Sequence, residues 1–222
     1  MNSPRDSTGG AALFAAIEAG DASAVQRLVA GNKSLLMARN QRGESPVLSA
    51  CYRRQRQVLE MLLATRPQLD VWEAAAAGQL EAVRAHLTRD RSLVAAYSHD
   101  GWTPLHLAAF FGHEAVAAEL LRRDASAEAW SRNALANQPL HAAAAGHHLA
   151  VCKLLVEAGA DVNARQHGGF SPLHGAAESG QQELVELLLD NGADRKAKAA
   201  NGDTPATLAT GAGHTSVAAL LK

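Results

Sequence analysis

The chain has 222 residues, of which 47% are hydrophobic and only 4% are aromatic, and 48 of them are alanine. Its formal net charge of −1 excludes a strong whole-molecule attraction to nucleic acid or to an anionic membrane. The composition therefore predicts a thin helical core rich in small side chains, and the overall charge indicates no particular partner.

Residues 1–10 are polar and lack the basic start and the apolar run of a secretion signal, so we expect a disordered lead-in to one domain spanning residues 11–222. The longest uncharged stretch, residues 133–152, contains amide side chains, a proline and three histidines, which argues against a transmembrane span. Cys51 and Cys152 lie far apart in helical surroundings. We therefore expect both to be reduced in a cytoplasmic protein.

Helix pairs are expected to follow one another along the chain, at about residues 11–40, 41–68, 69–98, 99–131, 132–166, 167–199 and 200–222. The last four pairs carry a proline at residues 104, 139, 172 and 205, at spacings of 35, 33 and 33. A turn segment begins 20 residues after each of the first three prolines. Two landmarks in register indicate an internal repeat.

The fourth pair shows how one unit works. Thr103 is a good helix N-cap, and Pro104 suits the first helical position, where a missing N–H costs nothing. Gly112 supplies a positive φ, which lets the chain reverse into a second helix. Neither helix can bury its apolar stripe alone, so neighbouring pairs must stack, and alanines let their backbones approach closely.

The run Thr103–His106, the two alanines that follow it and the segment Gly159–Ala164 resemble the ankyrin repeat, and the resemblance covers nearly the whole chain. It implies an all-α ankyrin-repeat solenoid of stacked helix pairs, with β-hairpin loops that project at right angles. It also implies a concave groove that serves as a binding surface.

Two loop lengths depart from the period. Only 24 residues separate the helix-to-helix turns of the second and third pairs, so residues 66–70 leave no room for a projecting hairpin. We expect a change in curvature there, between the first two pairs and the other five. The loop between Ala129 and Pro139 is two residues longer than its counterparts and is expected to bulge. Such changes tend to fall on the binding face of a repeat array.

Two helix-to-helix turns lack the glycine that the other pairs use. Arg54 takes its place in the second pair and His147 in the fifth. We expect a strained or altered connection at Arg54 and a shifted turn at His147, because a left-handed backbone favours glycine.

His106, His141 and His174 recur at one position of the unit, roughly 10 Å apart along the stack. That spacing is too long for a shared metal ion, whose ligands lie about 2 Å away. The resemblance implies a structural role, in which they hydrogen-bond between neighbouring loops. His148 and Cys152 share a helix face, but no second ligand pair accompanies them, and no nucleophile or phosphate-binding motif is present. We expect no metal, no cofactor and no enzymatic activity.

Six of the nine aromatic residues lie between residues 97 and 170, mostly outside the apolar stripes. In the family that the chain resembles, partners contact the hairpin tip, the residue before Thr-Pro and the end of the first helix. Exposed aromatic residues there would form an apolar hot spot for a protein partner, and mutual packing is the competing interpretation. The predicted partner-binding residues are Tyr97, His99, Asp100, Trp102, Phe110, Phe111, Trp130, Leu135 and Phe170.

A second surface is basic, since residues 1–70 carry nine basic against six acidic side chains. Its residues are Arg42, Tyr52, Arg53 and Arg56. This surface offers an alternative function, the binding of phosphate, nucleic acid or a membrane surface. A run of arginines on a helix is also typical of a plain solvated face, so nucleic acid is the less favoured partner.

The sequence thus predicts a non-catalytic module that binds another protein through its concave face and hairpin tips. An inhibitor, immunity or scaffold role would fit, and the pattern does not identify the partner. We expect a monomer, with self-association through the aromatic residues left open. Arginine outnumbers lysine by 16 to 5, which together with the alanine content indicates a GC-rich bacterial genome.

Overall fold

The computed structural model describes residues 4–222, and its regular backbone there is entirely helical. The α-helices are α1 (Pro4–Glu18), α2 (Ala22–Gly31), α3 (Pro46–Tyr52), α4 (Arg56–Ala64), α5 (Val71–Ala76), α6 (Leu80–Arg89), α7 (Pro104–Phe111), α8 (Glu114–Arg122), α9 (Pro139–Gly146), α10 (Leu149–Glu157), α11 (Pro172–Glu178), α12 (Gln182–Asp190), α13 (Pro205–Gly211) and α14 (Thr215–Leu220). Three short 3-10 helices are η1 (Lys33–Met37), η2 (Arg91–Ala95) and η3 (His167–Gly169).

The chain is helical earlier than its sequence suggests. Helix α1 begins at Pro4, so the disorder expected over residues 1–10 is wrong from that residue onward, and residues 1–3 lie outside the described part of the chain. Helix α1 contacts η1, a neighbour that the sequence pattern does not reveal. A Cβ on Gly9 would lie 3.4 Å from the Leu35 side chain, in ordinary van der Waals contact.

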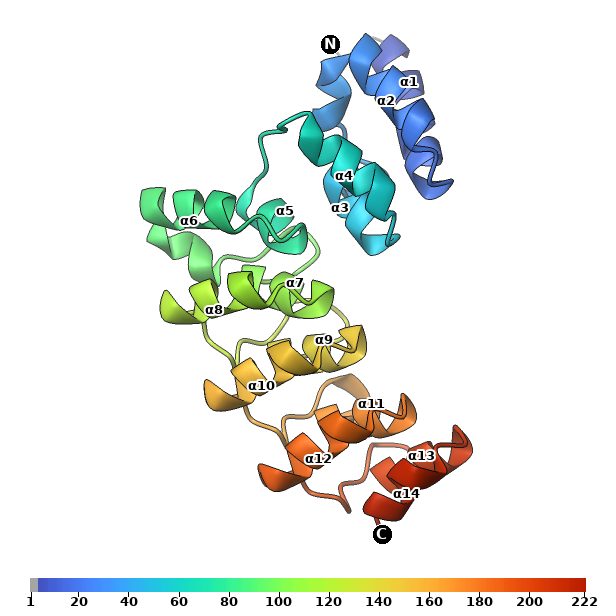
Figure 1. Cartoon of the computed structure of the whole chain (residues 1–222), viewed down its shortest axis with the longest axis vertical. Helices are drawn as coiled ribbons and strands as arrows, with labels where there is room; N and C mark the ends of the chain where they lie inside the picture. Colours follow the sequence, from blue (N-terminus) through green and yellow to red (C-terminus); the bar gives the residue numbers. More distant parts are fainter. Residues whose placement is uncertain (1–3) are drawn as a thin grey trace.

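Consecutive helices form pairs, and the pairs stack into an elongated solenoid with the two termini at opposite ends (Figure 1). From α5 onward the first helices of the pairs form an inner row, α5, α7, α9, α11 and α13. The second helices form an outer row, α6, α8, α10, α12 and α14. This is the all-α solenoid that the repeat pattern predicts.

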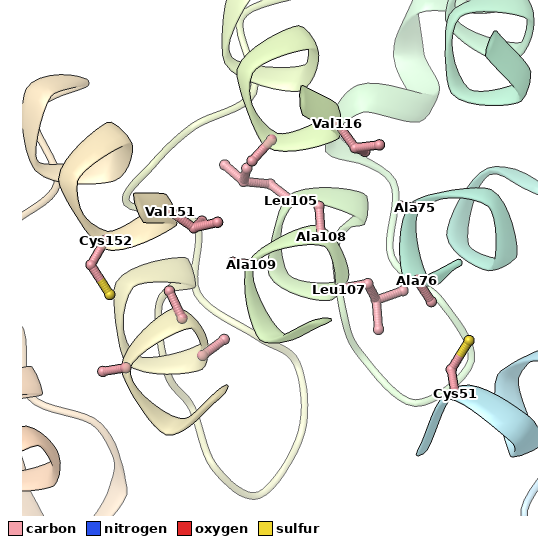
Figure 2. Packing of buried hydrophobic residues seen from close by; sticks show 14 of the residues in the cluster. Cys51, Ala75, Ala76, Leu105, Leu107, Ala108, Ala109, Val116, Val151 and Cys152 are labelled. Atoms are coloured by element: carbon pink, nitrogen blue, oxygen red, sulfur yellow. The ribbon is translucent and has the colours of Figure 1, made fainter. Parts of the chain in front are cut away.

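The inner row is buried on nearly every side. Residues 104–109 of α7 are all buried, because α5 and α9 flank the helix and α8 covers its back. Figure 2 shows Leu105 and Ala108 among the neighbouring helices. The outer helices are amphipathic instead, so that Val116 and Leu120 of α8 face inward and are at most 1% exposed. Small alanines on the inner row let adjacent helices approach closely, which accounts for the composition.

The turn between the two helices of a pair keeps one geometry even where glycine is absent. Gly112 has φ 78°, Arg54 φ 53° and His147 φ 64°. His148 N donates to Ala143 O, five residues earlier, and the equivalent residues of the other pairs form the same bond. The shifted turn expected at His147 is therefore wrong. Both non-glycine residues occupy the left-handed region, which is strained for a residue with a Cβ.

Five loops project from the stack, each between the second helix of one pair and the first helix of a later pair. We call them fingers 1 to 5 and define them as residues 38–45, 96–103, 129–138, 164–171 and 197–204. One backbone hydrogen bond joins the two arms of each finger, as between Ser98 N and Trp102 O at 2.8 Å in finger 2. Residues 4–222 contain no β-strand. The fingers are turns rather than two-stranded hairpins, because arms this short form a single cross-arm bond.

Both departures in loop length have the expected structural effect. Helix α4 ends at Ala64 and α5 starts at Val71, so no finger projects between them. Figure 1 shows α1 to α4 as a block inclined to the rest of the stack, with α4 and α6 diverging. In finger 3 the closing bond joins Ser131 N to Asn137 O, whereas the other fingers close over residues four apart. The two extra residues form the predicted bulge.

A comparison of two glycines tests how the pairs are held together. Gly159 has φ 85° and open space around its missing Cβ, so Gly159→Ala should cost only the backbone strain, about 1 kcal/mol. Gly78 has φ 69°, and its Cβ would lie 2.6 Å from Nδ1 of His113, whose Nε2 donates to Ala76 O at 2.9 Å. Gly78→Ala should therefore cost at least about 1 kcal/mol more.

Urea unfolding of the two variants measures this difference. Equal losses of unfolding free energy would show that the His113 ring is not anchored against the preceding pair.

Candidate functional site

Fingers 2 to 5 form a continuous row because each one bonds to the next through its backbone. Arg132 N of finger 3 donates to Gly101 O of finger 2 at 2.8 Å. His167 N donates to Leu135 O at 2.9 Å, and Ala200 N donates to Gly168 O at 2.8 Å. The finger tips are thus held in fixed positions relative to one another.

Below the tips, the three recurring histidines hydrogen-bond helices α7, α9 and α11 to the finger that follows each of them. Nε2 of His106 donates to Asn137 O at 3.1 Å, and Nε2 of His141 donates to Phe170 O at 3.3 Å. Nε2 of His174 donates to Asp203 O at 3.2 Å. The structural role that the resemblance implied for these residues matches this geometry.

The other ring nitrogen fixes the neutral tautomer. Nδ1 of His174 accepts from Ser171 N at 3.1 Å and faces the Ser171 hydroxyl at 2.8 Å. Nδ1 of His106 faces the Thr103 hydroxyl at 2.8 Å. Since Nδ1 accepts while Nε2 donates, protonation of the ring would place a proton against a donor. Burial lowers the pKa of all three histidines, in agreement with a neutral ring.

The paired rings near the end of α7 are half-buried rather than open. Phe110 and Phe111 pack edge to face with ring centroids 5.0 Å apart, and Phe111 packs on Tyr52 at 5.4 Å. Each ring therefore gains packing energy within the chain and still presents part of its surface.

The aromatic side chains of the fingers also pack against neighbouring residues. Trp102 packs on His106 with centroids 5.4 Å apart, and Phe170 packs edge to face on His174 at 5.6 Å. The Tyr97 hydroxyl donates to Trp130 O at 3.0 Å, and the guanidinium of Arg132 lies 3.9 Å from the centre of the Tyr97 ring. These contacts hold the rings in place along fingers 2, 3 and 4.

Finger 3 carries the most exposed apolar side chains of the predicted surface. Trp130 is 44% exposed and Leu135 is 49% exposed. The only other large hydrophobic side chain that is comparably exposed in residues 4–222 is Met37. The bulge therefore presents two of the three.

The predicted partner-binding surface and the basic surface of the second pair lie next to each other. The Tyr52 hydroxyl donates to Asp100 Oδ2 at 2.9 Å, and Nε2 of His99 donates to Arg42 O at 2.9 Å. Burial raises the pKa of Tyr52, and the charge of Asp100 raises it further. Because no finger projects after α4, finger 2 contacts finger 1 directly. No pattern in the sequence indicates these two contacts.

The basic surface expected in the second pair is largely neutralised. Arg53 lies between two carboxylates, with nitrogen–oxygen distances of 2.9 Å to Glu44 and 2.9 Å to Glu18. Its side chain is only 17% exposed. Arg42 and Arg56 remain exposed, and Arg56 pairs with Glu60 one helical turn away. The expectation of an open arginine-rich face is corrected at Arg53, because its two acidic partners come from two other elements, Glu18 from α1 and Glu44 from finger 1.

Candidate metal ligands do not cluster in the described part of the chain, and its two thiols are buried. Residues 4–222 contain no group of three or more His, Cys, Asp or Glu side chains that could hold a metal ion. Cys51 and Cys152 are free and buried, and burial raises the pKa of each thiol to about 12. No helix in residues 4–222 combines the length and the apolar character needed to cross a membrane.

The neutral histidines predict how the fold responds to acid. Burial lowers the pKa of His106 and of His141 from 6.5 to about 4. Between those values the unfolded chain binds protons that the folded chain does not, so unfolding free energy is lost as the pH falls from about 6.5 to about 4. The loss is about 3 kcal/mol for each ring.

Chemical unfolding of the wild type and of His141→Gln at several pH values tests this. The glutamine can still donate to Phe170 O, but it does not titrate. The variant should lose about 3 kcal/mol less than the wild type over the same pH range. Parallel curves for the two proteins would contradict the assignment.

The arginine pairs give a second prediction. Arg53→Ala should lower the unfolding free energy by about 2 kcal/mol, because the buried Glu44 carboxylate loses its close cationic partner and keeps only Asn40 and the more distant Arg42. Arg56→Ala is the matched control, since its ion pair with Glu60 is exposed and should contribute nothing measurable. The urea midpoints of the two variants measure the contrast, and similar midpoints would show that Arg53 does not stabilise the second pair.

A comparison with known families agrees with this geometry. The family model described as ankyrin repeats (3 copies) matches residues 71–166, 126–199 and 165–222, which together cover more than half of the chain. The matches begin at Val71, the first residue of α5 and of the regular stack. No curated protein matches the chain. Repeats of this family are in general protein–protein interaction modules. From its stacked helix pairs, its fingers and this match, the chain belongs to the ankyrin repeat family.

Proposed function

We propose that the chain binds a partner protein through its finger tips and the concave face beside them, without catalysing a reaction. The contact surface consists of Tyr97, His99, Asp100, Trp102, Phe110, Phe111, Trp130, Leu135 and Phe170. The observation that carries the proposal is finger 3, whose bulge exposes Trp130 and Leu135 at 44% and 49%.

The energetics favour such a surface. Trp, Tyr and Phe dominate the centres of protein interfaces, where they fill pockets on the partner. The backbone bonds between fingers fix these side chains before the partner arrives, so less entropy is lost on binding. Half-buried rings such as Phe110 and Trp102 support the exposed pair and are held in defined orientations.

Binding of this kind acts by occupying or bridging a partner, which fits an inhibitor, an immunity protein or a scaffold. We place the protein in the cytoplasm as a monomer, where its two thiols would stay reduced. The alternative of phosphate, nucleic-acid or membrane-surface binding is less favoured, since Arg53 is already paired with Glu44 and Glu18.

The test compares the wild type with Trp130→Ala plus Leu135→Ala in affinity enrichment from the native lysate, read by mass spectrometry. Both side chains are exposed, so the double variant should melt close to the wild type. The wild type should retain a partner that the double variant loses. The affinity should fall tenfold or more, because the lost contacts contribute about 1.4 kcal/mol or more to binding.

Met37→Ala is the control, because Met37 is 64% exposed and lies outside the fingers. It should retain the partner. Retention of the same protein by all three baits would move the binding site away from finger 3.

A further inference from the structure

A cavity of about 270 Å³ opens where the inclined N-terminal block meets the regular stack. It lies between the α3–α4 turn on one side and the ends of α5, α7 and α9 on the other. We call it the junction cavity. It exists because the second pair does not stack squarely on the third, where the finger is missing, and it concerns a different kind of ligand from the protein partner proposed above.

The walls of the junction cavity are apolar. Leu59 of α4, Ala76 of α5 and the rings of Phe110 and Phe111 line it. Cys51 completes the wall, and Figure 2 shows its sulfur directed from α3 toward Ala76. Burial raises the pKa of the Cys51 thiol to about 12, so this side chain is neutral and contributes an apolar surface.

Two arginines and two histidines form the rim of the cavity. Arg54, Arg56, His113 and His148 line it, and no aspartate or glutamate does. Arg56 already pairs with Glu60, whereas Arg54 forms no ion pair with a carboxylate among the side chains described for residues 9–222. Arg54 is therefore the cation that a ligand at this site could engage.

Two of the five non-glycine residues that have a positive φ in residues 4–222 lie at or beside the cavity. The helix-to-helix turns elsewhere use glycine, and the two exceptions are Arg54 at φ 53° and His147 at φ 64°. Arg54 lines the cavity, and His147 stands between two lining residues, Gly146 and His148. Burial lowers the pKa of His148, and the charge of Arg54 lowers it further. Strained non-glycine residues that persist in one place point to a function there.

We propose that the junction cavity binds a small organic anion whose apolar body fills the space between Leu59, Ala76 and the phenylalanine pair and whose acidic group meets Arg54. The volume of 270 Å³ corresponds to roughly nine water molecules, so the ligand has about ten non-hydrogen atoms. A medium-chain carboxylate has that size and that separation of charge from apolar body.

Calorimetric titration with octanoate, and with 1-octanol as the neutral counterpart of the same length, tests the chemistry. Octanoate should bind one site per chain with a Kd of about 1 mM or tighter. It should bind about tenfold more tightly than 1-octanol, the difference expected of a charge-assisted contact. Equal affinities, or no heat from either probe, would overturn the proposal.

Arg54→Gly tests the site without endangering the fold, because glycine relieves the left-handed strain at that position. It should weaken octanoate binding about tenfold and leave 1-octanol unchanged. Arg66→Gly is the matched control, since Arg66 also has a positive φ, 51°, and does not line the cavity. If Arg66→Gly weakened octanoate as much, the effect would be one of overall charge and the proposal would fail.

Amide chemical shifts locate the ligand. Octanoate should shift the resonances of Cys51 and Phe110 and leave those of finger 3 unchanged. Leu59→Trp, which fills the cavity from α4, should abolish binding of both probes while its thermal transition stays cooperative. Shifts confined to finger 3, or binding undiminished in folded Leu59→Trp, would place the ligand elsewhere and overturn the assignment.

Discussion

In helices α7, α9 and α11, one hydrogen bond from a buried imidazole to the carbonyl of the next finger joins the inner helix to the unit that follows it. His106, His141 and His174 each form this bond while Nδ1 accepts from the cap of their own helix. A neutral ring with both nitrogens engaged can be buried at little cost, whereas an unpaired one could not. The direction of fingers 3, 4 and 5, and so the position of their tip residues, depends on this bond.

The third pair lacks both the histidine and the finger before it, and the structure changes there. Glu73 occupies the histidine position, closes a capping box with Asp70 and pairs with Arg39 at 3.2 Å. With no finger after α4, His99 and Asp100 of finger 2 bond to Arg42 and Tyr52 of the second pair. The first two pairs are thereby fixed at an inclination (Figure 1), and the junction cavity opens between them and the regular stack.

Rigid display and irregularity together define what the chain can bind. The regular units hold the fingers in register, and the two irregular lengths, the missing finger and the bulged finger 3, give the surface its individual features. One places Trp130 and Leu135 in solvent, and the other creates an apolar space with a cationic rim. An array of identical units would offer neither feature, because every loop would pack like its neighbour.

The repeat pattern by itself determined the helix pairs, the caps at Thr103 and Pro104, the buried histidines and the two irregular loops. Each of these depends on residues close in sequence or one repeat away, and a solenoid contacts only its neighbours. Tertiary structure alone decided that Tyr52 meets Asp100, that Arg53 is enclosed by Glu18 and Glu44, and that α1 starts at Pro4. The contact of Tyr52 with Asp100 follows from the angle between the two blocks of helices, whereas the Arg53 pairs form within the first block. That angle is set by packing across the junction, which no local spacing encodes.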